Sequence, residues 1–522
     1  MRVDDRTADD APAAAVVERT SWHPGIVVAG VVAITVGLVL RFWTRSDLWL
    51  DEALTVNVAK LPLRDIPNAL RHDGGPPLYY LLLHVWMRVF GDSDGVIRAF
   101  GGVTSVASLP LMWLAARRAA GRGAEWVGVV LLISSPFAIR FATEARMYAL
   151  VILLVLVGYL QLTKALARER PTAVDLVGLT LTSGLLMLTH YWSLYLLLAV
   201  GAGFVAMSAL GRPDRRASYR LVLLGIAGGG ILFAPWLPVF VYQLKHTGTP
   251  WAQPATFAAM VNAVSEFAGG KSSAGRSLGL IFFALAGIGL FGAAVDRWHV
   301  ELDLRTRPRG RGPAFAGAAT LAIAISIGLV TGSAFAARYT AVVFPVFILL
   351  VTIGTTALAD ERIRATVVAV AMACGLIAAS QNVSVNRTQA GQVARAIKAE
   401  VAPGDVVAYC PDQLGPATSR LLPAGIDQIT FPRRTSPRFV DWVDYAEHNH
   451  AANPDAFANL VDQHAGPHAV WVVWSFNYRT FDAKCERINQ VLAVSRPGAR
   501  ELVRLDNDKF FEHADLIRYP GR

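Results

Sequence analysis

Residues 26–40 read IVVAGVVAITVGLVL, an apolar run without a charged side chain, and a second long apolar run occupies 220–242. A helix of roughly 20 apolar residues crosses the hydrocarbon layer of a membrane, which is about 30 Å thick. Across the 522 residues, 54% are hydrophobic and only 17% are charged, and the mean hydropathy is +0.41. A soluble chain of this length would carry more charge on its surface. The sequence therefore predicts a polytopic α-helical membrane protein.

Eleven segments are apolar enough to be candidate transmembrane helices. They lie near 25–42, 99–116, 123–139, 147–163, 173–189, 193–210, 220–242, 277–295, 313–333, 339–358 and 365–381. A twelfth apolar stretch, 77–90, would extend only about 21 Å as a helix. It also carries His84 and Arg88 among several aromatic residues. We therefore expect it to lie in the membrane interface rather than to cross.

The charges of the loops predict the orientation. If 77–90 does not cross, every basic loop faces the cytoplasm, as the positive-inside rule requires; if it crosses, all of them move outside. These loops are 117–122, 164–170, 212–220, 297–311 and 362–364. They also explain the net charge of +10 without nucleic-acid binding. We expect a cytoplasmic disordered tail at 1–24, a transmembrane domain at 25–381 with outer loops 43–98 and 243–276, and an extracytoplasmic domain at 382–522.

The last of these regions is polar, and its pattern alternates between strands and helices. Predicted helices at 393–401, 415–422 and 481–492 alternate with predicted strands at 405–410 and 469–475, and two strands around a turn occupy 501–520. Such alternation is typical of a small α/β domain. Two of the three cysteines, Cys410 and Cys485, lie in it, and they either form a disulfide or remain two buried thiols. Cys374 lies in an apolar run, and the chain has no CxxC motif for a structural zinc site.

Two adjacent acids, Asp51 and Glu52, follow the first apolar run in the stretch LWLDEA. Carboxylates so close to lipid are costly unless they have a partner or a task. One interpretation is a general base that is shielded from bulk water. The other is a cap at the start of a surface helix over 53–71.

A turn rich in glycine and proline follows, HDGGPPLYY at 72–80. It ends one surface helix, starts the next, and brings His72 and Asp73 back towards Asp51. These two side chains are candidates for binding acceptor hydroxyls or a divalent metal, and a plain exposed turn is the alternative.

Arginines at the outer ends of helices run against the charge bias of the loops. Arg140 and Arg146 flank Glu144, and Arg338 precedes Tyr339. A guanidinium group matches the oxygen atoms of a phosphate, so these arginines are candidate phosphate ligands. An internal ion pair with Glu144, or snorkelling towards lipid, are the alternatives.

Another outer turn carries His190 and Trp192, which either stack on a sugar ring or belong to the interfacial aromatic belt. In loop 243–276, the residues Trp251, Glu266 and Lys271 are candidates for a gate.

Taken together, these motifs resemble the GT-C glycosyltransferases, in particular the bacterial relatives of the dolichyl-phosphate-mannose protein mannosyltransferases. The aminoarabinose transferases of lipid A, which are related, also end in a soluble outer domain. The resemblance covers Leu48 to about Tyr195, and then Arg338 and Tyr339. It rests on Asp51-Glu52, Pro76-Pro77-Leu78-Tyr79-Tyr80, Glu144-Ala145-Arg146-Met147-Tyr148, Thr189-His190-Tyr191 and Arg338-Tyr339.

The resemblance implies a polyprenyl-phosphate sugar as donor, with Asp51 as base on the acceptor hydroxyl and inversion at the anomeric carbon. The cationic side chains would stabilise the leaving phosphate. In some relatives an acidic–basic pair precedes the proline of the second motif, whereas this chain has Gly74 and Gly75. The residues assigned to the phosphate are Arg140, Arg146, Arg338 and Tyr339, and those assigned to the substrates are His72, Asp73, Tyr79, Glu144, Tyr148, His190 and Trp192.

We therefore expect an enzyme of the cytoplasmic membrane that transfers a sugar to a cell-envelope acceptor. Mannose is favoured, with arabinose as the alternative, and the acceptor is a protein, a glycolipid or a polysaccharide. A flippase for lipid-linked sugars, a polymerase or ligase, and a non-catalytic lipid-binding relative are the competing hypotheses. The sequence has no inverted repeat of the kind that many transporters carry.

Overall fold

The structure is a computed structural model, and it describes residues 24–248, 256–270, 272–331, 335–476, 478 and 480–522. The predicted tail 1–24, apart from its last residue, lies outside the described residues. The same is true of Trp251 and Lys271 in the predicted gate.

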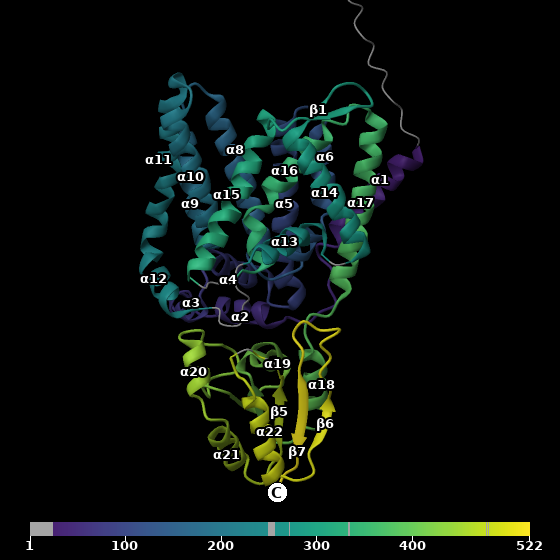
Figure 1. The fold of residues 1–522 in the computed structure, drawn as a ribbon. Coiled ribbons are helices and arrows are strands. Elements are labelled where there is room, and N and C mark those ends of the chain that lie inside the picture. The colour runs from purple at the N-terminus through teal and green to yellow at the C-terminus, as the bar shows by residue number, and fades with distance from the viewer. Residues whose placement is uncertain (1–23, 249–255, 271, 332–334, 477, 479) are drawn as a thin grey trace, which may run out of the picture.

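A bundle of helices forms the larger part of the molecule, and a smaller α/β domain adjoins one end of it (Figure 1). The helices of the bundle are α1 (Pro24–Val39), α5 (Asp94–Ala120), α6 (Ala124–Ile133), α7 (Pro136–Ala142), α8 (Tyr148–Ala167), α9 (Ala173–Thr189), α10 (Trp192–Leu210), α11 (Arg216–Phe233), α12 (Leu237–His246), α14 (Ser273–Phe291), α15 (Pro308–Thr331), α16 (Phe344–Thr355) and α17 (Glu361–Ser384).

The apolar helices make the chain a multi-pass membrane protein. Among the described residues, seven helices are long and apolar enough to cross a membrane, or eight if α6 and α7 form one bent span. Three other predicted spans coincide with the shorter apolar helices α1, α9 and α16. All eleven predicted segments thus fall on helices, although length and composition alone support a smaller number of spans.

The predicted span 123–139 is not one straight helix. It is divided into α6 and α7, whose axes differ by 55°. Pro136 occupies the first turn of α7, and the hydroxyl of Ser135 accepts a hydrogen bond from the amide of Ala138. Serine at the cap and proline at the first position are typical of a new helix start, which explains the break.

Three short helices lie between the bundle and the α/β domain: α2 (Leu50–Ala59), α3 (Ile66–Asp73) and α4 (Leu78–Phe90) (Figure 1). α3 ends at Gly74, whose φ of 88° is a left-handed conformation that glycine adopts without strain. α4 buries Leu83 on one face and exposes Val85 and Val89 on the other. An apolar face left open in this way suits a short helix at a membrane surface, as the sequence predicts for 77–90.

The C-terminal region folds around a five-stranded sheet in the order β4-β3-β5-β7-β6. Strands β3 (Val406–Cys410), β4 (Asp427–Thr430) and β5 (Val470–Trp474) run parallel to one another. Strand β7 (Asp515–Tyr519) is antiparallel to both of its neighbours, β5 and β6 (Arg500–Val503). Helices cover both faces, which is why the central strands are apolar throughout. They are α18 (Ala390–Glu400), α19 (Gly415–Leu421), α20 (Tyr445–Ala451), α21 (Pro454–Ala465) and α22 (Lys484–Ser495).

Polar contacts join this sheet region to the short helices. The imidazole of His72 lies 2.9 Å from the carboxylate of Asp441, and the carbonyl of His72 accepts a hydrogen bond from the amide of Trp442. Arg420 forms a 2.8 Å ion pair with Asp94 at the start of α5. The two regions are therefore fixed to each other by charged and backbone groups.

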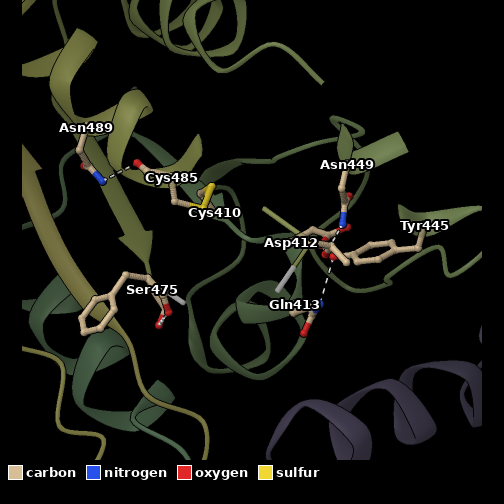
Figure 2. The surroundings of a disulfide bond; sticks show 10 residues. Cys410, Asp412, Gln413, Tyr445, Asn449, Ser475, Cys485 and Asn489 are labelled. Carbon is tan, nitrogen blue, oxygen red and sulfur yellow. Dashed lines mark hydrogen bonds between the residues drawn. A yellow bond between two sulfur atoms is a disulfide. The ribbon is translucent and has the colours of Figure 1, made fainter. Parts of the chain in front are cut away.

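Cys410 and Cys485, whose pairing the sequence leaves open, form a disulfide that joins the end of β3 to the start of α22 (Figure 2). Next to it, Asn489 donates a 3.1 Å hydrogen bond to the carbonyl of Cys485. Cys374 on α17 is a free thiol.

Replacing both disulfide cysteines by serine is expected to lower the free energy of unfolding of the α/β region by about 2–5 kcal/mol. The reason is that the bond closes a loop of 75 residues. A urea titration followed by tryptophan fluorescence measures the loss, and Cys374→Ser serves as the control. Equal midpoints in the two variants would contradict the expectation.

Candidate active site

The carboxylate of Asp51 lies between two guanidinium groups. Asp51 is in the first turn of α2, and its Oδ2 atom is 3.4 Å from Nη2 of Arg338 and 3.9 Å from Nη2 of Arg146. The side chain of Asp51 is 16% exposed, and Oδ2 has no hydrogen-bond partner among the described residues. The family resemblance implies that these three residues serve one site, and the structure brings them together.

Arg146 is held by contacts with α2. Its Nη1 atom donates to the hydroxyl of Thr55 at 2.9 Å and to the backbone carbonyl of Asp51 at 3.4 Å. Within the described part of the chain, its Nε atom is buried and has no hydrogen-bond partner. Arg338 lies 5.8 Å from the ring of Trp49 and 5.6 Å from that of Tyr339. Two cations around one carboxylate leave a positive charge that suits a phosphate.

Glu52 has surroundings different from those of its neighbour. It is fully buried, and both of its carboxylate oxygens accept hydrogen bonds from Arg98, at 2.8 and 2.6 Å. The amide of Ala145 donates to the same carboxylate at 2.9 Å. A carboxylate occupied in this way holds segments together rather than reacting. Of the two acids predicted to be catalytic, Asp51 is therefore the one placed to meet a substrate.

Glu144 takes part in an internal ion pair. Its Oε2 atom lies 3.7 Å from Nη1 of Arg387, which also donates through Nη2 to the hydroxyl of Thr143 at 3.1 Å. The ion pair that the sequence offers as an alternative is thus present, with a partner that the sequence did not indicate. Arg140, a predicted phosphate ligand, is exposed at the end of α7, and its guanidinium lies 5.9 Å from the ring of Phe141.

A line of aromatic rings adjoins the arginines. The rings of Tyr148 and His190 are 5.7 Å apart, those of His190 and Tyr339 5.5 Å, and those of Trp192 and Tyr339 5.7 Å. In the described part of the chain, the buried hydroxyls of Tyr79 and Tyr148 have no hydrogen-bond partner. Buried polar groups are rarely left unpaired, so these hydroxyls are suited to a polar ligand.

His72 and Asp73 have different side-chain partners. His72 turns to Asp441, whereas Asp73 accepts a 2.7 Å hydrogen bond from the hydroxyl of Tyr80. No group of three or more histidine, cysteine, aspartate or glutamate side chains that could hold a metal is found among the described residues. The divalent metal that the sequence leaves open therefore stays a prediction.

Sequence reasoning missed Arg98 and Arg387. Arg98 had a usable signal, because it is a further arginine in the outer loop 43–98. Arg387 is the first charged residue after the last apolar segment, but no motif around it marks it as part of the site.

Glu52→Gln is expected to lower the stability of the protein by about 3–5 kcal/mol, because it leaves a buried guanidinium without its counter-charge. The melting temperature of the detergent-solubilised protein measures the effect. Glu447→Gln, a change of an exposed acid on α20, is the control. If both variants melt at the same temperature, the buried pair does not have this role.

Comparison with known proteins supports the architecture. Residues 74–238 match the family described as dolichyl-phosphate-mannose-protein mannosyltransferase. The crystal structure of ArnT from Cupriavidus metallidurans bound to undecaprenyl phosphate is similar with a TM-score of 0.58 at 12% identity, covering 95% of this chain and 98% of that chain. ArnT in the apo state gives a TM-score of 0.61 at 13% identity, with coverages of 95% and 97%.

The search of proteins with curated function found no match. At identities this low, the likeness to ArnT concerns the fold, and it extends over nearly the whole of both chains. The chain therefore has the GT-C glycosyltransferase fold and resembles both ArnT and the dolichyl-phosphate-mannose-protein mannosyltransferases.

Proposed function

We propose that this protein transfers a sugar from a polyprenyl-phosphate donor to a hydroxyl group of a cell-envelope acceptor, on the outer face of the cytoplasmic membrane. The observation that carries the proposal is the position of the Asp51 carboxylate, partly exposed and 3.4 and 3.9 Å from two guanidinium groups. A base next to two phosphate-binding cations is what a displacement at a glycosyl phosphate requires.

In the proposed reaction, Asp51 accepts the proton of the acceptor hydroxyl. The oxygen of that hydroxyl attacks the anomeric carbon, and the bond from this carbon to the phosphate oxygen breaks on the opposite face, which inverts the configuration. The electron pair of that bond leaves with the polyprenyl phosphate. Arg146 and Arg338 stabilise the charge that develops on the phosphate. When the phosphate binds, it replaces Asp51 as the ion-pair partner of these two arginines.

The charge of the loops at the two ends of the bundle supports this orientation. The hairpin of β1 (Gly292–Ala294) and β2 (Val300–Leu302) lies at the end opposite to α2 and the α/β domain (Figure 1). Its second strand lies in the basic loop 297–311, which the positive-inside rule predicts to be cytoplasmic. The end with Asp51 then faces outwards. Nucleotide sugars are cytoplasmic, so an outward-facing transferase needs a donor carried by a lipid, and ArnT has been crystallised with undecaprenyl phosphate.

The sugar is proposed from the family likeness and from the lining of the site. The family that matches residues 74–238 is named for mannose, and we favour this sugar over arabinose. The hydroxyls of Tyr79 and Tyr148, which have no hydrogen-bond partner among the described residues, and the ring of Trp192 would contact a neutral, hydroxyl-rich ring.

Asp51→Asn is expected to reduce sugar transfer by about 10²- to 10⁴-fold, the usual contribution of a general base. Donor binding is expected to remain, because the amide keeps the shape of the carboxylate. The assay is release of radiolabelled sugar from polyprenyl phosphate by purified protein. Asp65→Asn, which changes an acid that is 51% exposed at the start of α3, is the control. Unchanged turnover in Asp51→Asn would exclude Asp51 as the base and favour a flippase or a non-catalytic lipid-binding protein.

Arg338→Ala is expected to weaken the binding of polyprenyl phosphate by about 1.5–3 kcal/mol, the range for a hydrogen bond with a charged group. The dissociation constant of the phosphate carrier measures the loss. Arg64→Ala removes a guanidinium that is 88% exposed in the same outer segment, and it controls for the overall charge. Equal affinities in the two variants would argue against a phosphate site at Arg338.

A further inference from the structure

Glu512, in the loop between β6 and β7, reaches the helix that carries Asp51. Its Oε2 atom accepts a 3.2 Å hydrogen bond from the amide of Leu50, the first residue of α2. The first amides of a helix have no partner within the helix and need an acceptor from elsewhere. Trp49, at the N-cap position, makes no side-chain hydrogen bond of this kind. The acceptor thus comes from a residue 462 positions away in the sequence.

The backbone of Glu512 is fixed by the chain that enters the α/β domain. Its amide donates to the carbonyl of Arg387 at 2.8 Å, and its carbonyl accepts from the amide of Gln389 at 2.9 Å. The amide of Arg387 in turn donates to the hydroxyl of Ser46 at 2.8 Å, four residues before Leu50. The carboxyl group of Glu512 therefore projects from a backbone that is hydrogen-bonded to residues 387–389, and these in turn are hydrogen-bonded to the segment before α2.

The residue before Glu512 makes a second contact with the same short segment. The ring of Phe511 meets the ring of Trp49 edge to face, with centroids 5.5 Å apart. Trp49 also lies 5.8 Å from the guanidinium of Arg338. The pair 511–512 thus contacts the pair 49–50, which directly precedes Asp51 and borders one of its two arginines.

The electrostatics of this position favour a neutral carboxyl group. Glu512 is only 6% exposed, and burial, with the nearby charges of Asp51 and Glu52 adding to it, raises the pKa of Glu512 to about 8. The carboxyl is then mostly protonated at neutral pH. It caps α2 without adding a third negative charge next to the two acids.

We propose that Glu512 is a positioning residue for Asp51, and that the α/β domain thereby forms part of the active site through its hold on the first turn of α2. The catalytic consequence rests on the proposed function, whereas the capping of α2 does not. Glu512 touches no reacting atom in this proposal. It acts by fixing the backbone from which the base projects.

The experiment compares Glu512→Ala, Glu512→Gln and Asp508→Ala in the full chain reconstituted in nanodiscs. Glu512→Ala is expected to lower kcat about tenfold and to leave the KM for the polyprenyl-phosphate donor within about twofold, because a small displacement of a reacting group costs turnover. Glu512→Gln is expected to stay within about twofold of wild type, because its amide oxygen accepts the same hydrogen bond and is uncharged. Asp508 is exposed in the same loop and is the matched control.

A second readout does not depend on activity. Hydrogen–deuterium exchange of the peptide that spans residues 48–56 is expected to be about tenfold faster at the first turn of α2 in Glu512→Ala than in the other two variants. If Glu512→Ala does not fold, Glu512→Asp, which withdraws the carboxyl by one methylene group, is expected to show the same two losses.

The outcomes separate the two proposals. Equal exchange and equal kcat in Glu512→Ala and Asp508→Ala would overturn the positioning role. A Glu512→Gln variant as defective as Glu512→Ala would also overturn it, because the capping acceptor is then not what matters. If the wild-type protein transfers no sugar, the proposed function fails, and the exchange measurement alone decides whether Glu512 holds α2.

Discussion

The buried ion pair between Glu52 and Arg98 is the interaction on which the geometry of the site depends. Charges buried this deeply are tolerated only when their hydrogen-bonding capacity is satisfied. Arg98 meets this condition by donating to the carbonyls of Ser46 and Asp47 as well as to Glu52. Glu52 meets it by also accepting from the amide of Ala145. This ion pair thus joins the segment before α2, α2 itself and the turn that leads to Arg146. It thereby holds Asp51 on α2 close to Arg146.

The neighbouring acids have different environments because they lie on a helix. Successive residues of an α-helix point about 100° apart, so Glu52 can face the interior while Asp51 faces the arginines. The exposed fractions of the two side chains, 0% and 16%, reflect this division. A motif of two adjacent acids at the start of a surface helix therefore supplies both a buried anchor and a carboxylate that faces the two arginines.

Much of this architecture is predictable from the sequence, because hydropathy and loop charge act locally. The helices and the strand–helix alternation after residue 382 come from such signals. The grouping of Asp51 with Arg146 and Arg338 in one site comes from the family resemblance. Contacts between residues that are far apart in the chain are not predictable in this way. His72 meets Asp441, and Glu512 meets Leu50, through the docking of the α/β region, and nothing in their local sequence indicates it. Ser135 and Pro136 are a signal for a helix start, but the apolar run on both sides of them favours a single span over 123–139.

The distribution of charge explains why a phosphate would bind beside Asp51 rather than beside Glu52. The inner acids Glu52 and Glu144 are matched by two arginines, Arg98 and Arg387. The outer arginines Arg146 and Arg338 share Asp51 as their ion-pair partner. Asp73 is another acid near Arg146, and burial raises its pKa. Two guanidinium groups thus face the carboxylate of Asp51 at the outer pair. Under the proposed function, this is the side of α2 to which a phosphate would be attracted.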